Sequence, residues 1–178
     1  IDKMLSGERH LFVLGTLSHS IAIEVYCTEQ ASIGLPGKYD YKIINTGLGV
    51  DKYHRTKQGQ WIDFARPATI NALPKSILSY SFFEKLVRHS LQKQSVDSFY
   101  DLHESILIHE GGGKLDLDSA DWVKLQEFGT CSYSAVEAWL HTQLTEKQGR
   151  LLDYIKAKIS VKKQKELVTL LEVDCGTD

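Results

Sequence analysis

The stretch HSIAIEVYC, residues 19–27, decides the fold that the sequence predicts. Ile21, Ile23 and Val25 alternate with other residues, which places all three on one face of an extended chain. This two-residue period predicts a β-strand with one apolar face. Such a strand needs neighbouring strands beside it and a layer of helices over its apolar face.

Two further strand patterns flank this stretch. HLFVLGTL, residues 10–17, is apolar and partly β-branched, and YDYKIIN, residues 39–45, follows the turn signal of residues 34–37. Strands joined by a connection rich in Gly and Pro predict an antiparallel hairpin. The start of one strand in a hairpin lies beside the end of the next, so we expect His19 and Asn45 at the same end of the sheet.

Helical spacing takes over after Pro74. A first helix is predicted there from apolar residues three to four apart, namely Ile77, Leu78, Phe82, Phe83, Leu86 and Val87. A second helix is predicted over residues 95–108, with the first serine as its N-cap. A third begins near Cys131, and residues 146–173 predict one or two amphipathic helices. Residues 109–122 contain three consecutive glycines and predict a mobile loop that serves as a lid or substrate flap.

The composition fits one folded domain. The chain has 178 residues, of which 42% are hydrophobic and 25% are charged, enough for a packed core and unlike a disordered chain. A net charge of −2 gives no general attraction to nucleic acid or to an anionic membrane, and no apolar run reaches membrane-spanning length. We expect a single α+β catalytic domain over residues 1–178, a small mostly antiparallel sheet packed against helices, with a helical extension from about residue 146.

Three cysteines, Cys27, Cys131 and Cys175, are too few and too scattered for a disulfide framework. A reducing compartment is the simpler interpretation. The seven histidines are scattered as well, and none pairs with a cysteine at zinc-finger spacing. No metal and no cofactor is therefore predicted.

Cys131 is the candidate nucleophile. In LQEFGTCSYSAVEAWL, residues 125–140, it follows Gly129 and Thr130 and stands at the start of the predicted third helix. A thiol with a pKa of ~8.5 is mostly protonated at neutral pH, and the amides at a helix N-terminus stabilise the thiolate. A structural, buried cysteine is the competing interpretation.

A nucleophilic cysteine needs a base, a residue that orients the base, and donors for the oxyanion. His19 heads the alternating strand and suits the role of base. Asn45 closes the partner strand and can hold one imidazole N–H, although Asn-Thr-Gly is also ordinary turn chemistry. Gln126 precedes Cys131 by five positions and can supply a side-chain amide to the oxyanion, or can simply face solvent.

Other candidates compete for the same roles. His54, in DKYH, follows the glycine-rich NTGLG turn and is a rival base. Glu24 lies in the middle of its strand and shares neither face nor end with His19, so we discount it as the orienting residue. His103 and His109 are six residues apart, out of helical register, and are expected at the surface.

The ordered set of His, Asn, Gln and Cys resembles the ubiquitin-like-protein protease clan, which includes SUMO proteases, the adenovirus protease, bacterial effector deubiquitinases and YopJ-type effector acetyltransferases. The segments SHSIAIEV, YDYKIINTGLG and LQEFGTCSYSAVEAWL carry the resemblance. It implies a papain-like fold in which His19 is the base, Asn45 orients it, Gln126 is the oxyanion donor and Cys131 is the nucleophile. The chain has Ser20 where the clan usually has Trp, and Asn45 where it usually has an acid.

The resemblance implies a cysteine hydrolase that cleaves an amide or isopeptide bond in a protein substrate, with ubiquitin or a relative as the first candidate. It also implies a bacterial effector that acts in the cytosol of a host cell. Two alternatives stay open. The same residues can instead serve an effector acyltransferase or a glutamine deamidase, and a protein with this fold can be a non-catalytic binding module.

Overall fold

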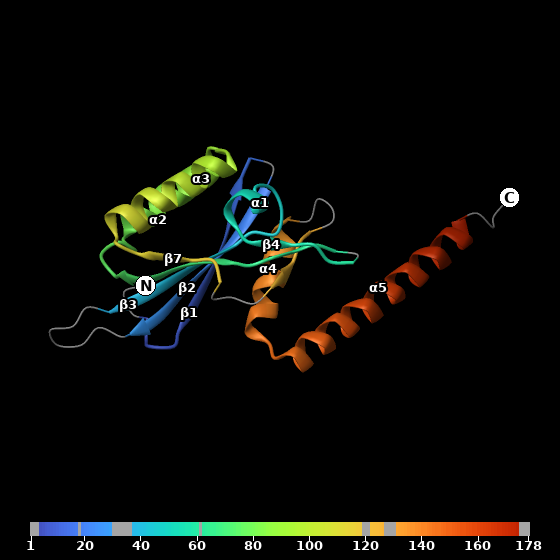
Figure 1. Ribbon diagram of the computed structural model, residues 1–178. Helices are drawn as coiled ribbons and strands as arrows, with labels where there is room; N and C mark the ends of the chain where they lie inside the picture. The colour runs from blue at the N-terminus through green and yellow to red at the C-terminus, as the bar shows by residue number, and fades with distance from the viewer. Residues whose placement is uncertain are drawn as a thin grey trace. The chain divides into compact units, whose positions relative to one another are not determined.

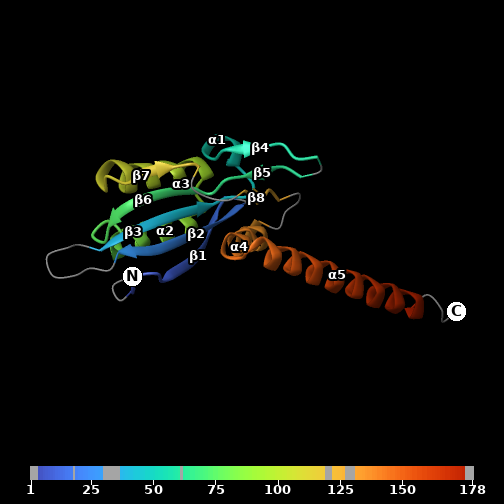
Figure 2. The same ribbon diagram turned by 60° about the horizontal axis from the view of Figure 1, so that its bottom comes forward.

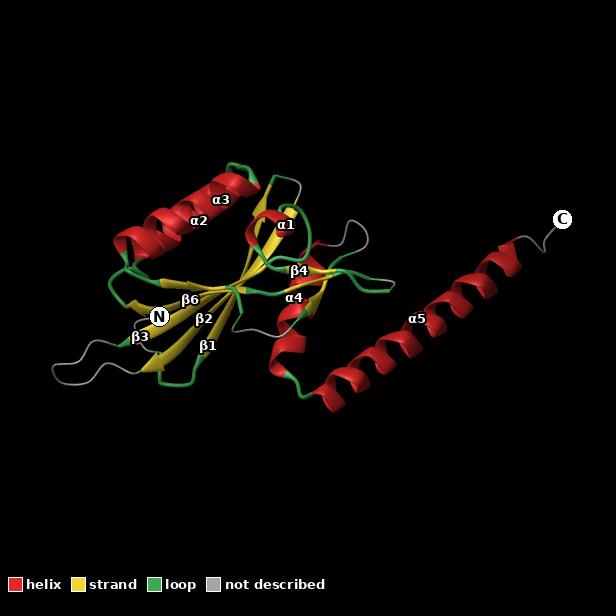
Figure 3. Cartoon of the chain, in the orientation of Figure 1, coloured by secondary structure: helices red, strands yellow, loops and turns green. Residues whose placement is uncertain are grey.

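Residues 9–116 contain a five-stranded antiparallel sheet with the order β1-β2-β3-β6-β7 (Figure 1). Its strands are β1 (Arg9–Thr16), β2 (His19–Glu29), β3 (Lys38–Ile44), β6 (Ala68–Pro74) and β7 (Lys114–Asp116). A second, three-stranded sheet with the order β4-β5-β8 consists of β4 (Thr56–Lys57), β5 (Phe64–Ala65) and β8 (Val123–Lys124). Together with the helices shown in Figure 3, this is the predicted α+β class with a mostly antiparallel sheet.

The structure is a computed structural model that describes residues 4–17, 19–29, 37–60, 62–118, 122–126 and 131–174. The side chains of residues 131, 132 and 164–174 lie outside this description, as does the predicted turn at residues 34–36. The chain divides into two units, Ile1–Thr142 and Gln143–Asp178, each of which is described by itself.

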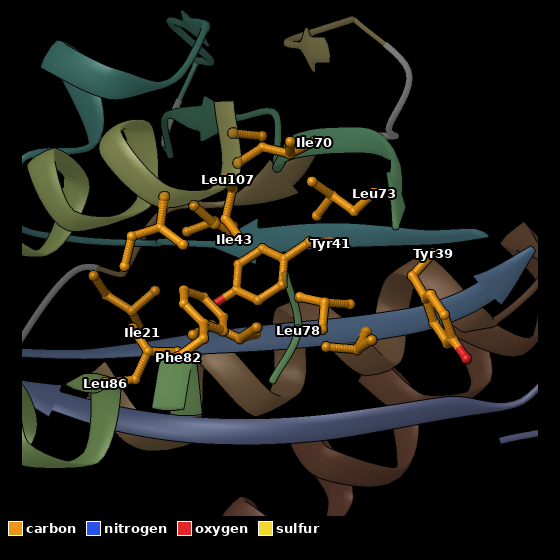
Figure 4. Packing of buried hydrophobic residues seen from close by; sticks show 14 of the residues in the cluster. Ile21, Tyr39, Tyr41, Ile43, Ile70, Leu73, Leu78, Phe82, Leu86 and Leu107 are labelled. Atoms are coloured by element: carbon orange, nitrogen blue, oxygen red, sulfur yellow. The ribbon is translucent and has the colours of Figure 1, made fainter. Parts of the chain in front are cut away.

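The apolar face of β2 carries the main core, as its alternation predicts. Ile21, Ile23 and Val25 are fully buried, and they pack with Tyr41 and Ile43 from β3 (Figure 4). The same cluster takes in side chains from α2 (Tyr80–Leu91), α3 (Val96–His103) and the π-helical turn η1 (Glu104–Glu110), among them Phe82, Leu86, Phe99 and Leu107. These helices therefore cover one face of the sheet.

The first predicted helix begins later in the chain than its apolar spacing suggested. The Ser79 side chain accepts a hydrogen bond from the Phe82 amide and caps α2, so the helix begins at Tyr80 and not near Pro74. Pro74 instead ends β6, and Val87 of the predicted apolar stripe is 49% exposed. The prediction for Ser95 was right, because its side chain accepts from the Ser98 amide and caps α3.

Part of the predicted loop at residues 109–122 is a strand. β7 pairs with β6, and Thr69 lies opposite Asp116. A Cβ on Gly113 would lie 2.5 Å from Ile70 Cγ2, so the backbone passes the core too closely for a side chain. The glycines therefore allow the chain to enter the sheet, and the prediction of a lid is wrong over Lys114–Asp116.

α4 (Cys131–Gln143) packs on the opposite face of the sheet (Figure 2). Ala135 and Ala138 of this helix form a second buried cluster with Ala22 and Ile44, the strand residues that alternate with the main core. The Trp139 indole N–H donates to Glu24 Oε2 at 2.5 Å. This polar contact fixes the middle of α4 beside the middle of β2.

In the second unit, α5 (Glu146–Asp174) is one continuous helix, where the sequence predicted one or two. Its N-terminus is capped by the Thr145 hydroxyl, which accepts a hydrogen bond from the backbone N–H of Gln148. Within the part of the chain that the structure describes, no helix is both long and apolar enough to cross a membrane.

The buried carboxylate of Glu24 generates a test of how α4 is held. Glu24 is 1% exposed and also contacts Arg9 at 2.7 Å and Lys42 at 3.4 Å. Replacing it with alanine removes charge-assisted hydrogen bonds, so we expect Glu24→Ala to lower the free energy of unfolding by about 2–3 kcal/mol. Urea denaturation measures this loss.

The control for this substitution is Glu29→Ala. Glu29 forms an ion pair with Lys38 in which both side chains are about half exposed, so its loss is expected to change the free energy of unfolding by less than about 1 kcal/mol. Equal losses in the two variants would contradict the role given to Glu24.

Candidate functional site

His19 and Asn45 lie in contact at one end of the five-stranded sheet. His19 is the first residue of β2 and Asn45 directly follows β3, so antiparallel pairing brings them together. The distance from His19 Nε2 to Asn45 Oδ1 is 2.7 Å, and the two residues are 4% and 1% exposed. The structure thus brings together the two residues that the sequence placed at this end.

The Asn45 amide has only one orientation that satisfies its neighbours. Its Nδ2 donates to the Leu48 carbonyl at 2.9 Å, and its Oδ1 accepts from the Gly47 amide at 2.9 Å. An oxygen acceptor facing His19 requires that Nε2 carry the proton. In the neutral ring, Nδ1 then has the free lone pair.

Burial sets the charge of His19. Loss of solvent lowers the pKa of this imidazole below its ordinary value of 6.5, while the hydrogen bond to Asn45 raises the pKa by a smaller amount. His19 is therefore neutral at pH 7. A neutral imidazole with Nδ1 unprotonated is able to accept a proton.

Gln126 lies beside this pair. Its backbone N–H donates to the Thr46 carbonyl at 2.8 Å. A Cβ on Gly47 would lie 2.4 Å from Gln126 Nε2 and 2.6 Å from His19 Cε1, so the side chains of both residues lie against this glycine. Gln126 Oε1 is buried without a hydrogen-bond partner among the described residues. A buried polar atom without a protein partner needs an explanation, and a bound water or ligand is one.

Cys131 begins α4, as the sequence predicted, but its side chain lies outside the described residues. The course of the helix is clear from later residues. Trp139 contacts Glu24, and the cluster that contains Ala135, one turn earlier, includes Ala22, nearer the start of β2. The first turn of α4 therefore points toward the end of the sheet that holds His19. Direct apposition of the Cys131 sulfur and the His19 ring stays a prediction.

His54, the rival base, follows α1 (Val50–Tyr53) and has both ring nitrogens engaged. Nδ1 lies 2.8 Å from the Arg66 carbonyl and Nε2 lies 2.5 Å from the Tyr100 hydroxyl. Burial lowers the pKa of His54 from 6.5 to about 4. The ring is thus neutral but has no lone pair left for a thiol, and the geometry favours His19 as the base.

The other acid and histidines of the sequence analysis lie away from this site. Glu24 is on the α4 face of the sheet, in agreement with its rejection as the orienting residue. His103 was expected at the surface, but it is 1% exposed, and its Nε2 lies 2.7 Å from the Tyr41 hydroxyl. His109 is at the surface, 3.6 Å from Glu104.

Tyr100 and Gly47 belong to the site but were not among the predicted site residues. Tyr100 lies on α3, and its hydroxyl contacts both Asn45 Nδ2, at 3.2 Å, and His54 Nε2. Nothing in its own segment distinguishes it from a core aromatic residue of an amphipathic helix. Gly47 stands in the glycine-rich NTGLG turn, and this pattern alone does not show which side chains lie against it.

Comparisons with protein-family models, curated proteins and solved structures found no match to this chain. Among the described residues of the first unit, no three His, Cys, Asp or Glu side chains lie close enough together to share a metal ion.

Gly47 provides a test of this close packing. A methyl group at this position would overlap the Gln126 amide and the His19 ring, so we expect Gly47→Ala to lower the free energy of unfolding by about 1–3 kcal/mol, as overpacking does. Gly15→Ala is the control, because its Cβ would meet Ser90 Oγ at 3.4 Å, an ordinary contact. Urea denaturation compares the free energies of unfolding of the variants. If Gly47→Ala unfolds with the same free energy as the wild type, the Gln126 and His19 side chains do not lie against Gly47.

The buried histidines generate a pH prediction. Burial lowers the pKa of His54 and of His103 from 6.5 to about 4, so between these pH values the unfolded chain binds more protons than the folded chain. We expect the free energy of unfolding to have its full value above pH 6.5 and to fall toward pH 4, by up to about 3 kcal/mol for each histidine. Urea denaturation from pH 7.5 to 4.5 measures this slope.

The slope is assigned by substitution. His54→Gln should make it shallower, because a buried neutral ring with a lowered pKa is removed. His109→Gln should leave it unchanged, since that side chain is exposed. Equal slopes in the wild type and His54→Gln would show that His54 takes up its proton without unfolding.

Proposed function

We propose that the protein is a cysteine hydrolase that cleaves an amide or isopeptide bond in a protein substrate, using a papain-like arrangement of Cys131, His19, Asn45 and Gln126. Ubiquitin or a ubiquitin-like protein is the first candidate substrate. The observation that carries the proposal is the hydrogen bond from His19 Nε2 to Asn45 Oδ1, with the Asn45 amide fixed on both sides. An action in the cytosol of a host cell rests on the resemblance of the sequence alone.

The tautomer of His19 is the one that this chemistry needs. In the proposed reaction, Nδ1 takes the proton of the Cys131 thiol, and the thiolate attacks the carbonyl carbon of the scissile bond. The imidazolium then gives that proton to the leaving amine, which departs and leaves a thioester. Water, deprotonated by Nδ1, attacks the thioester and releases the carboxylate and the free thiol.

Two features support a place for the oxyanion. The donor end of the Gln126 side-chain amide, Nε2, lies against Gly47 beside the His19 ring. The helix that begins at Cys131 offers its first amides, which are free of intrahelical partners. A side-chain N–H and a helix N-terminal amide are donors of the kind that stabilise a tetrahedral intermediate.

The alternatives differ in what they leave on the enzyme or the substrate. An acyltransferase or a glutamine deamidase would use the same thioester chemistry, but would not react with an electrophile attached to the C-terminus of ubiquitin. A binding module would keep the fold without a reactive thiol. Both are distinguished from the hydrolase by measuring the reactivity of Cys131 with general and with ubiquitin-based reagents.

The test uses vinyl-sulfone probes built on ubiquitin and on SUMO. We expect the full chain to form a covalent adduct with at least one probe, detected by mass spectrometry and mapped to Cys131. Cys131→Ala should abolish the adduct. His19→Gln should slow its formation about 10²–10⁴-fold, since the thiol then lacks its base. Cys175→Ala is the matched control and should react like the wild type.

Iodoacetamide separates the remaining outcomes. Alkylation of Cys131 well ahead of the buried Cys27 at pH 7, without a probe adduct, would favour the acyltransferase or deamidase. If Cys131 reacts no faster than an unperturbed thiol, and His19→Gln changes nothing, the proposed catalytic role is wrong and the binding module remains.

A further inference from the structure

We propose that Tyr100 and His54 are positioning residues for His19, joined to it through Asn45 by one buried series of hydrogen bonds. The series runs from the Arg66 carbonyl through His54, Tyr100 and Asn45 to His19. The inference rests on the proposed function, because it takes His19 as the base. It adds that residues behind Asn45 hold the ring in the tautomer whose Nδ1 can accept the thiol proton.

The direction of the series is set at its far end. The Arg66 carbonyl can only accept, so the His54 nitrogen 2.8 Å away, Nδ1, carries the proton. The ring is neutral at pH 7 because its pKa is about 4, which leaves Nε2 as an acceptor. The Tyr100 hydroxyl, 2.5 Å from Nε2, must therefore donate its single proton to His54.

The same direction continues to the site. Since its proton goes to His54, the Tyr100 oxygen is free to accept from Asn45 Nδ2, at 3.2 Å. The second Nδ2 hydrogen goes to the Leu48 carbonyl, and Oδ1 accepts from Gly47 and from His19. Every donor in the series meets an acceptor, and no member can reverse without leaving a buried group unpaired.

Packing holds the middle of the series in place. Tyr100 is 7% exposed, and its ring stacks on that of Tyr53 at 3.9 Å between centroids and 11° between planes. Its ring meets the His54 ring edge-on at 5.7 Å. The Tyr53 hydroxyl donates to Asp97 at the start of α3, so α1 and α3 are also joined at this point. The hydroxyl of Tyr100 is therefore presented by a rigid ring.

The molecule contains a matched control. Tyr41 and His103 form a second buried pair, with 2.7 Å between the hydroxyl oxygen and Nε2, and His103 Nδ1 lies 2.6 Å from the Phe99 carbonyl. This pair has the same chemistry as Tyr100 and His54, but within the described part of the chain no hydrogen bond continues from it to Asn45 or His19. Tyr41→Phe therefore removes an equivalent hydroxyl without touching the series.

The wild-type chain, labelled with ¹⁵N at histidine, gives the first measurement. Long-range ¹H–¹⁵N spectra distinguish the two neutral tautomers of each ring at pH 7.5, and His19→Gln and His54→Gln assign the signals. We expect His19 to be protonated at Nε2 and His54 at Nδ1. Either ring in the opposite tautomer would overturn the proposal.

Tyr100→Phe is the second measurement. Loss of one hydrogen bond of about 1 kcal/mol corresponds to a factor of about five, so we expect the ratio of Nε2–H to Nδ1–H forms of His19 to fall up to about fivefold. The iodoacetamide reactivity of Cys131 at pH 7 should fall by a similar factor. Tyr41→Phe should change neither quantity. An unchanged His19 tautomer ratio in Tyr100→Phe, or an equal change in Tyr41→Phe, would overturn the proposal.

Substitution of His54 adds a rescue test. In His54→Gln, one side-chain amide can donate to the Arg66 carbonyl and accept from Tyr100, so the wild-type tautomer ratio of His19 should be kept. His54→Leu removes both functions and should lower the ratio as Tyr100→Phe does. Failure of the proposed function has a different signature, since Cys131 would then be unreactive while the His19 tautomer still responds to Tyr100→Phe.

Discussion

The register of β2 against β3 is the constraint on which the rest of the structure depends. Ala22 lies opposite Ile44, and this pairing turns Ile23 and its alternate neighbours toward α2 and α3 while Ala22 faces α4. A slip of one residue would exchange the two faces. It would also separate His19 from Asn45, whose contact needs the first residue of one strand beside the residue that follows the other. The register of β2 against β3 therefore determines both which residues form the core and which residues meet at the site.

The parts of the fold that could be predicted are those set by local chemistry. The alternation in β2, the Ser95 cap and the start of α4 at Cys131 each follow from a few neighbouring residues. The strand β6 could not be recognised in this way, because ATINALP contains Asn71 and Pro74 and has no clear alternation. It is a strand because the free edge of β3 needs a partner, and that need is a property of the whole sheet.

In the candidate site, too, the contacts set by local sequence could be predicted and those set by packing could not. The contact between His19 and Asn45 could be predicted because a hairpin links sequence order to position. The contact between Asn45 and Tyr100 joins residues 55 positions apart and depends on how α3 packs on the sheet, which no local pattern encodes. His103 was misplaced for the same reason, since its partner Tyr41 lies on a strand 62 positions away. Buried polar partners are a result of packing, and only a structure reveals them.

An amide at position 45 fits this site better than the acid that the resemblance would place there. A carboxylate has no donors, so it would face the Leu48 carbonyl and the Tyr100 oxygen with lone pairs on both sides. It would also bury a negative charge beside a neutral His54. The amide satisfies all four contacts, but it gives an imidazolium at His19 no ionic partner. In the proposed mechanism, the stabilisation of the thiolate must then come mainly from the N-terminus of α4, which makes the position of that helix, held by Trp139 on Glu24, part of the chemistry.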